Sequence, residues 1–388
     1  MKRQPFTIRR STARRGQRRG VVVLHVLVAL VLLLLVASLA INWAWLTLVA
    51  RNLQARADAA ALAGAPGLLD EDLLRDQAGD QADDRLEAEA LADDCRKRNN
   101  AVSAPSLQVV PADLLLTPGV VDDPSLGAAA QFAPNLPYNA LEVRAQRSSA
   151  GANPLTWLLN VSGMGPGALS VTARAALDNW LVGFQPTSDR RSPVVPLAID
   201  VQAWKNARTQ DKFPSGGNGV KEIVVRLGTF EANAVTANSA VIAYTGGFQP
   251  DQIIDQVLHG LSPAHLTVTH GQLGPVKSSA APVVFRGANK VVSSFVSQFA
   301  DTLQSLVDEG RDARRVFLLY DSQDPQTNVA AGRFRIVGFV AARVCQAQFT
   351  SNHLQLTLEP CFLLHPTAWT ASDADQPNLY IHKLRIVR

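Results

Sequence analysis

The stretch Val21–Ala50 reads VVVLHVLVALVLLLLVASLAINWAWLTLVA and holds no formally charged side chain, with His25 as its only ionisable residue. About 20 apolar helical residues span the ~30 Å hydrocarbon core of a bilayer, at a rise of about 1.5 Å per residue. The run Val21–Ile41 reaches that length. Trp43 and Trp45 follow it where an aromatic belt at the far membrane interface is expected. The sequence therefore predicts one transmembrane helix near the N-terminus.

A cleavable signal peptide is the alternative interpretation of this run, because Ser38-Leu39-Ala40 is an acceptable small-residue cleavage site. The apolar region of a signal peptide is only about 7–15 residues long. The present run extends well to both sides of its central residues Leu30 and Leu34. Its length favours an uncut membrane anchor.

The residues before the apolar run determine its predicted orientation. Residues 1–20 contain no acidic side chain and eight basic ones: Lys2, Arg3, Arg9, Arg10, Arg14, Arg15, Arg18 and Arg19. Positive charges that flank a membrane helix stay on the cytoplasmic side. We therefore expect a single-pass protein of the inner (cytoplasmic) membrane, with a cytoplasmic tail (residues 1–20) and an exported C-terminal domain.

The positive charge of the whole chain comes from this basic tail. The net charge is +4, but without the eight basic residues of the tail the chain has 29 Lys and Arg against 33 Asp and Glu, a net charge of −4. A basic pI can indicate nucleic-acid binding. Here the excess of positive charge indicates membrane topology instead, so we predict no nucleic-acid partner.

The helix is expected to continue beyond the membrane surface. Apolar and small residues recur at spacings of three and four, the helical period: Leu46, Val49, Leu53, Ala57, Ala60 and Ala61. No helix-breaking residue occurs before Gly64 and Pro66. One helix from about Val21 to Ala63 is therefore predicted, and residues 21–65 are treated as one transmembrane and emergent segment.

The residues around the apolar run resemble a known family. Arg18-Arg19-Gly20 precedes the run, Arg51-Asn52-Leu53-Gln54 follows it, and Ala57–Ala65 reads ADAAALAGA. This order of motifs, over about residues 18–65, is similar to the amino terminus of Flp/Tad pilus-assembly proteins of the TadG-like group. The resemblance implies a membrane-anchored accessory or structural protein of a Tad-type pilus or related secretion apparatus. Such a protein acts through contacts with pilus or assembly-machinery proteins outside the inner membrane.

The resemblance also implies roles for residues at the end of the helix. Small residues such as Ala60, Ala61 and Gly64 permit close approach between helices, and Asp58 stands beside them. We expect these four residues to form an exposed helix–helix contact in an assembly. A solvated helix charge without such a role is the alternative for Asp58. An Ala60→Arg variant is then expected to disturb assembly more than membrane anchoring.

Two departures from the family pattern leave alternatives open. The Gly20–Val21 bond resembles a prepilin-peptidase processing site, but the fifth residue after Gly20 is His25, where pilins usually carry Glu. A minor pilin cleaved after Gly20 is therefore an alternative to the permanent anchor. Larger members of the group carry a von Willebrand A-type domain with an Asp-x-Ser-x-Ser metal motif. The segment Asp321-Ser322-Gln323-Asp324 fails this motif at its third position, so no metal site is predicted.

Residues 66–140 are predicted to connect the long helix to the exported domain. Residues 70–98 show a partial apolar face and are expected to form a second, acidic helix. Asp76, Asp80 and Asp84 share one face of it. A solvated acidic face is favoured over a calcium site, because calcium ligands normally come from a turning loop. Residues 101–140 are rich in proline and predict a loop with one or two short strands.

Residues 141–388 are expected to form a mostly β exported domain with a few helices, so that the fold class is α+β. The predicted strands are Leu141–Gln146, Ala168–Ala175, Val194–Ala198, Lys221–Gly228, Leu266–Thr269, Arg315–Tyr320, Arg333–Gln346, Leu354–Leu363 and Leu379–Val387. Ile336–Val344 is apolar on both faces, which predicts a central strand. Helices are predicted near Pro250–Gly260 and Asn289–Glu309, the second with an apolar stripe typical of core packing.

Two of the predicted strands are expected to pair as a hairpin. With a turn at Thr350–His353, Cys345 faces about Leu358 and Cys361 faces about Ala342. The two cysteines are then out of register for a disulfide unless a β-bulge shifts them. The sequence leaves their pairing open.

No motif of catalytic chemistry occurs in the sequence. Gly-x-Ser-x-Gly, Cys-x-x-Cys and His-Glu-x-x-His are absent, and Gly216–Lys221 lacks phosphate-loop spacing. His259, His265 and His270 could suggest a metal, but residues five apart on a strand point to opposite faces. We predict a protein that is not an enzyme, with no cofactor, metal or evident small-molecule substrate. An exported enzyme or binding module on a membrane anchor is the alternative from another class.

Overall fold

The computed structural model describes residues 17–69, 71–75, 81–102, 108–134, 136–149, 153–159, 167–206, 208–213, 217–229, 237–245, 247–288, 290–310, 313–321, 332–350 and 353–387. The chain divides into two compact units. The first unit comprises Met1–Ala57, Asn99–Leu115 and Arg144–Thr172, and the second comprises Asp58–Arg98, Leu116–Val143 and Ala173–Arg388. Each unit is therefore assembled from segments that are separated in the sequence.

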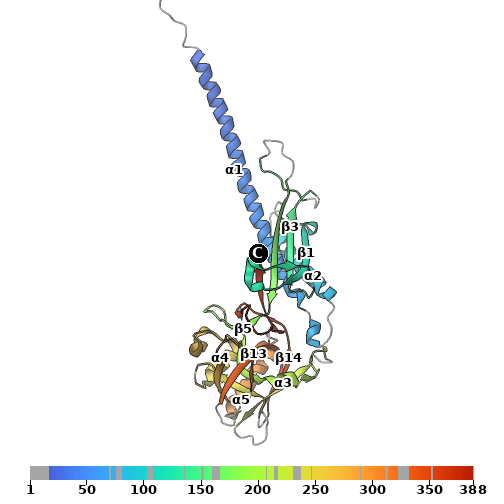
Figure 1. Ribbon diagram of the computed structural model, residues 1–388, viewed down its shortest axis with the longest axis vertical. Helices are drawn as coiled ribbons and strands as arrows, with labels where there is room; N and C mark the ends of the chain where they lie inside the picture. The colour runs from blue at the N-terminus through green and yellow to red at the C-terminus, as the bar shows by residue number, and fades with distance from the viewer. Residues whose placement is uncertain are drawn as a thin grey trace, which may run out of the picture. The chain divides into compact units, whose positions relative to one another are not determined.

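The first element is the helix α1 (Gln17–Gly64), which Figure 1 shows as one long continuous helix. The prediction of a helix from Val21 to Ala63 is confirmed. Neither Gly nor Pro occurs between these two residues, so the backbone hydrogen bonds of the helix continue without a break. The helix ends at Gly64, and Pro66 lies in the short 3₁₀ helix η1 (Ala65–Leu68) that follows.

The second helix, predicted over residues 70–98, is divided in the structure. Its first part is the 3₁₀ helix η2 (Glu71–Arg75), and the α-helix α2 (Gln81–Ala101) begins only later. Residues 76–80, between these two helices, lie outside the described residues. Acidic residues in the first turn of α2 favour a helix N-terminus at this place.

One sheet has six strands in the order β15-β17-β4-β3-β1-β2. The strands are β1 (Leu114–Val121), β2 (Phe132–Ala133), β3 (Ala140–Arg147), β4 (Leu169–Asp178), β15 (Leu363–Leu364) and β17 (Ile381–Val387). β17 pairs with β4 in antiparallel register, from Lys383 opposite Asp178 to Val387 opposite Arg174. The strands predicted at 141–146, 168–175 and 379–387 are confirmed. Two 3₁₀ helices flank β1: η4 (Pro111–Asp113) and η5 (Pro124–Ala129).

The largest sheet has nine strands, in the order β10-β9-β6-β12-β13-β14-β8-β11 with β7 paired to β8. The strands are β6 (Val194–Asp200), β7 (Arg208–Gln210), β8 (Glu222–Thr229), β9 (Ser239–Ala243), β10 (Val283–Ala288), β11 (Lys290–Val291), β12 (Arg314–Asp321), β13 (Gly332–Thr350) and β14 (His353–Pro360). β10 pairs with both β9 and the beginning of β13, so β10, β9, β6, β12 and β13 form a closed ring. β13 pairs with β10, β12 and β14, which confirms that Ile336–Val344 lies in a central strand.

Two predicted helices are present beside this sheet. α4 (Pro250–His259) packs against β6, and α5 (Ser293–Asp308) packs against β13 (Figure 1). The predicted apolar stripe of α5 is buried in the main core: Phe295, Val296, Phe299, Ala300, Leu303 and Leu306. α5 begins later than the predicted Asn289, because Lys290 and Val291 pair with β8 as strand β11. A six-residue helix, α3 (Val201–Asn206), follows β6.

The strand predicted at Leu266–Thr269 is wrong, because this segment lies in the 3₁₀ helix η6 (Pro263–Thr269). Ser262 and His265 form a capping box at its start, in which the Ser262 N–H donates to His265 Nδ1 at 3.3 Å. Pro263 occupies the first position of the helix, where its fixed φ favours helical backbone.

A separate two-stranded sheet consists of β5 (Leu181–Phe184) and β16 (Ala368–Thr370).

The predicted hairpin forms between β13 and β14. Its register is confirmed over Gln346–Thr350, which pairs with His353–Thr357. A β-bulge then falls at Cys345, so that Val344 lies opposite Leu358 in its place. The bulge corrects the predicted position of Cys345, because an extra residue in one strand shifts every later pair by one.

The bulge does not bring Cys345 and Cys361 into register for a disulfide. Cys361 donates its backbone N–H to the Ala341 carbonyl oxygen at 3.2 Å, whereas the prediction placed it opposite Ala342. Cys345 and Cys361 form no disulfide with each other. β14 ends at Pro360, earlier than predicted, because proline has no N–H to continue a strand ladder.

Candidate membrane-contact site

The apolar part of α1 exposes its side chains. Each large aliphatic residue from Val22 to Ile41 keeps 43–66% of its surface exposed. More than half of the exposed large apolar side chains in the described part of the chain lie in this stretch of α1. Folded domains rarely leave a continuous apolar patch of this extent in contact with water. α1 is long and apolar enough to cross a membrane.

The residues predicted to mark the membrane helix lie on this exposed surface. Leu30 and Leu34 are exposed one helical turn apart. Trp43 is exposed just beyond them, and Trp45 is half-buried with its Nε1–H donating to the Thr156 carbonyl oxygen at 3.2 Å. An apolar ring with a bonded polar end suits the boundary between lipid and water.

The predicted processing site lies inside α1. The backbone of Gly20 and Val21 is helical, and α1 begins three residues earlier at Gln17. The Gly20–Val21 bond that a prepilin peptidase would cleave therefore lies within the helix. Processing at this bond stays a prediction.

The small residues at the end of α1 are buried, so the prediction that they form an exposed contact is wrong. Ala60 is 2% exposed, Ala61 is fully buried, and Asp58 is half-buried. At Gly64, an added Cβ would lie 2.8 Å from the Ala88 carbonyl oxygen and 2.5 Å from a methyl carbon of Leu141. The small size of these residues therefore permits close packing of α1 within the chain itself. An assembly role for this segment stays a prediction.

Gly67 in η1 makes a still closer approach to α2. An added Cβ would lie 2.6 Å from the backbone nitrogen of Ala88, 2.8 Å from its Cα and 2.9 Å from the carbonyl carbon of Glu87. All three neighbours are backbone atoms, so α2 would have to move to admit even a methyl group. This contact could not be predicted from the sequence, since a glycine after a helix is usually explained by turn geometry.

We predict that Gly67→Ala destabilises the chain by about 1–3 kcal/mol, the usual range for overpacking a tight site. The measurement is thermal unfolding of the detergent-solubilised full chain by circular dichroism. Gly247→Ala is the matched control, because no heavy atom lies within 4 Å of a Cβ added there. Equal melting temperatures for the two variants would contradict the close approach of η1 and α2.

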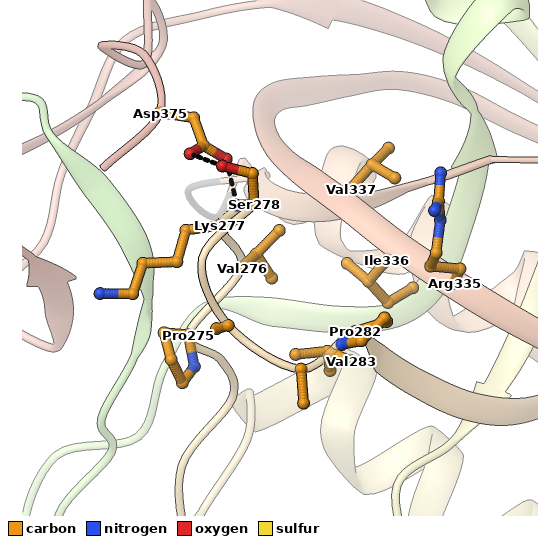
Figure 2. Close-up of a pocket in the computed structure, with 12 residues that line it drawn as sticks. Pro275, Val276, Lys277, Ser278, Pro282, Val283, Arg335, Ile336, Val337 and Asp375 are labelled. Carbon is orange, nitrogen blue, oxygen red and sulfur yellow. Dashed lines mark hydrogen bonds between the residues drawn. The ribbon is translucent and has the colours of Figure 1, made fainter. Parts of the chain in front are cut away.

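The second unit contains a hollow of about 320 Å³ lined by Pro275–Val283, the beginning of β13 and Asp375. Figure 2 shows Asp375 turned toward Ser278, whose N–H and hydroxyl donate to its two oxygens at 2.5 and 2.6 Å. Lys277 pairs with Asp373, and Arg335 at the opposite side pairs with Asp321 at 2.6 Å. Both basic groups around this hollow are therefore paired with a carboxylate, whereas Asp375 is bonded to an uncharged serine.

A second hollow of about 380 Å³ is lined in part by Glu359, one of two buried carboxylates that were not predicted from the sequence. Glu222 on β8 and Glu359 on β14 are both buried, and Glu359 lines the hollow. Glu222 accepts hydrogen bonds from the N–H groups of Lys212 and Phe213 at 2.7 and 2.5 Å. Arg343 lies 3.5 Å from Glu359. Burial raises the pKa of Glu359, and the charge of Glu222 adds to this rise.

We predict that Glu359 makes the folded chain less stable as the pH rises from the acid range. A raised pKa in the folded state means that the folded chain holds this proton more tightly than the unfolded chain does. The contribution is fully present below the ordinary pKa of 4.5 and is lost as the pH passes through the raised value. Glu359→Gln should therefore lose less stability than the parent chain between pH 4.5 and neutrality. Melting temperatures across this range test it, with the exposed Glu87→Gln as control, and identical slopes for Glu359→Gln and the parent chain would refute it.

Two of the three histidines that the sequence suggested as metal ligands lie near one carboxylate. His265 Nε2 lies 3.5 Å and His259 Nε2 lies 3.9 Å from the Asp255 carboxylate, which also accepts a hydrogen bond from Arg191 at 2.8 Å. His270 instead ends η6 in left-handed backbone, so the strand geometry assumed for it is wrong. Burial lowers the pKa of His265. Within the described residues, no three His, Cys, Asp or Glu side chains are arranged to hold a metal ion.

The acidic face predicted for the second helix lies only partly in the described ranges. Asp84 is half-buried near the start of α2, whereas Asp76 and Asp80 fall outside the described residues. Segment 322–324, considered for the metal motif, also lies outside them. The chain matches no known protein-family model, no curated protein and no solved structure.

Proposed function

We propose that this protein is a single-pass membrane anchor for an exported α+β region that acts by binding other proteins. The observation that carries the anchoring is the exposure of every large aliphatic side chain between Val22 and Ile41. Transfer of one such side chain from water to an apolar environment is favourable by about 1.5–3 kcal/mol. A bilayer around this stretch would therefore stabilise it far more than water does.

The orientation follows from the tail. Residues 1–20 carry eight basic side chains and no acidic one, and such segments stay in the cytoplasm. The residues after α1 would then lie outside the inner membrane. The residues beyond the tail have a net charge of −4, so they supply no overall electrostatic attraction to anionic lipid.

The partners we propose are subunits of a Tad-type pilus or a related secretion apparatus. Support comes from the motif order of residues 18–65, which resembles the TadG-like group. At the first hollow of the second unit, Lys277 and Arg335 are each paired with an aspartate, which favours a binding role over catalysis at that place. The protein would act as an accessory or structural component, held at the outer face of the inner membrane by α1.

The experiment that tests the anchor is intact mass with amino-terminal sequencing of the protein from the membrane fraction. A chain that begins within the basic tail supports a permanent anchor. A start at Val21 would favour a processed minor pilin, and a start near Ile41 would mean release of the exported region.

In the host bacterium, deletion of the gene should abolish Tad-type filaments, and the intact gene should restore them. Unchanged filaments in the deletion strain would refute the pilus role.

A further inference from the structure

The segment Asn153–Leu159 lies against α1 directly after its exposed apolar stretch. Asn42 holds it through both ends of its side-chain amide. Asn42 Nδ2–H donates to the Leu159 carbonyl oxygen at 2.8 Å, and the Leu159 N–H donates to Asn42 Oδ1 at 3.1 Å. The Trp45 indole N–H donates to the Thr156 carbonyl oxygen at 3.2 Å. These residues all belong to the first unit.

Burial of α1 on this side agrees with these contacts. Asn42 is only 5% exposed, and Ser38, one turn earlier on the same face, is also buried. Their neighbours Leu39, Ile41 and Trp43 are exposed. One face of the helix is therefore covered by protein at this level, while the rest is bare.

The depth of the segment follows from the geometry of the helix. Val22–Ile41 has a helical length of about 30 Å, which matches the hydrocarbon thickness of a bilayer. If this stretch fills the bilayer, Asn42 and Trp45 stand at its outer boundary. Because Leu159 and Thr156 are hydrogen-bonded to these two residues, they stand at the same boundary.

The side chains at this boundary suit lipid. The segment reads NPLTWLL and has no charged residue. Leu155 is buried and pairs its backbone with Gly167, with both N–H···O distances at 3.0 Å. Leu158 and Leu159 are 55% and 39% exposed. The buried end fixes the segment, and the exposed leucines extend the apolar surface of α1 sideways.

We propose that Thr156–Leu159 is a second lipid contact, which enters the outer headgroup region beside α1. The ligand is the bilayer surface, because the segment is hydrogen-bonded to α1 directly after its apolar stretch, so that its exposed leucines stand at the depth of the helix end. Asn42 acts as the tether, since its amide replaces the hydrogen bonds that the backbone of Leu159 would otherwise lose away from water. This inference depends on the proposed membrane crossing of α1. The contact would set the depth of α1 and prevent its rotation about its own axis.

The test places spin labels on the full chain in vesicles of phosphatidylethanolamine and phosphatidylglycerol. The three cysteines are first replaced by alanine, and single cysteines are then introduced as Leu34→Cys, Leu158→Cys and Val102→Cys. Val102 is the control for a label in water, because its side chain is 87% exposed. It lies two residues after Asn100, whose side chain accepts a hydrogen bond from Arg56 at 2.6 Å. Arg56 lies about 22 Å along the helix beyond Ile41 at ~1.5 Å per residue. Collision with oxygen and with a water-soluble nickel complex is measured for each label.

The expected result is a several-fold preference for oxygen over nickel at 34 and 158, with the opposite preference at 102. A label at 34 in lipid with a label at 158 in water overturns the second lipid contact and leaves the membrane anchor intact. A label at 34 in water overturns the anchor and this contact together. Circular dichroism of each labelled chain checks that the fold is retained.

Discussion

A chain that carries both Leu30→Lys and Leu34→Lys should no longer fractionate as an integral membrane protein. Both leucines are exposed near the middle of the apolar stretch of α1, so the lysines would have to enter the hydrocarbon. A lysine at the centre of a membrane helix costs about 3 kcal/mol, so the pair costs roughly 6 kcal/mol. The measurement is the fraction of protein that remains in the membrane pellet after alkaline extraction.

The matched control changes the same residue type elsewhere. Leu126→Lys with Leu136→Lys replaces two leucines that are as exposed as Leu30 and Leu34 but belong to the second unit. This control should stay in the membrane pellet. If the α1 variant also stays there after alkaline extraction, α1 does not hold the chain in the membrane.

The long helix could be predicted because its evidence is local. An apolar run, helical spacing and the absence of Gly and Pro all lie within one stretch of sequence, and α1 (Gln17–Gly64) follows the predicted bounds closely. The strands β12, β13 and β14 were predicted for the same reason, since each has a strong apolar or alternating pattern. Short apolar runs such as β9 (Ser239–Ala243) were missed, because periodicity cannot separate a buried strand from other buried segments at this length.

Burial of the small residues could not be predicted from the helix alone. The sequence shows that Ala60, Ala61 and Gly64 permit close approach, but it does not identify the neighbour. In the structure Gly64 approaches Ala88 and Leu141, which are distant in the chain. The helix-packing surface is therefore used within the chain, which is why Ala60→Arg is now expected to disrupt the fold before any assembly.

The polar contacts of the candidate site could not be predicted from the sequence either. Asn42 and Leu159 are 117 positions apart, and Leu159 lies in the connection between β3 and β4. The buried carboxylates of Glu222 and Glu359 come together because β8 and β14 are neighbours. The patterns of β8 and β14 record the period of each strand but not their adjacency, because a long stretch of chain separates them, whereas a short turn joins the predicted hairpin strands β13 and β14.

Asp178→Asn should have the largest effect on the stability of the second unit. Asp178 is 1% exposed at the end of β4, and its Oδ2 accepts hydrogen bonds from Arg385 Nε at 2.6 Å and from the Thr370 hydroxyl at 2.5 Å. Arg385 also donates to the Thr370 hydroxyl at 2.7 Å. This triad joins β4, β16 and β17. Removal of one charge from such a buried pair leaves the other uncompensated, which costs about 3–5 kcal/mol.

A double-mutant cycle separates the ion pair from simple loss of packing. Arg385→Met alone should also destabilise the chain, and Asp178→Asn with Arg385→Met should cost clearly less than the sum of the two, because the double variant leaves no unpaired charge. The control is Asp94→Asn, which breaks an ion pair of the same 2.6 Å separation with Arg98 on the surface of α2. This exposed pair should contribute less than about 1 kcal/mol. The free energy of unfolding is measured with denaturant. Equal losses of this free energy for Asp178→Asn and Asp94→Asn would show that the buried triad contributes no more than an exposed ion pair. The attachment of β17 would then depend on backbone pairing alone.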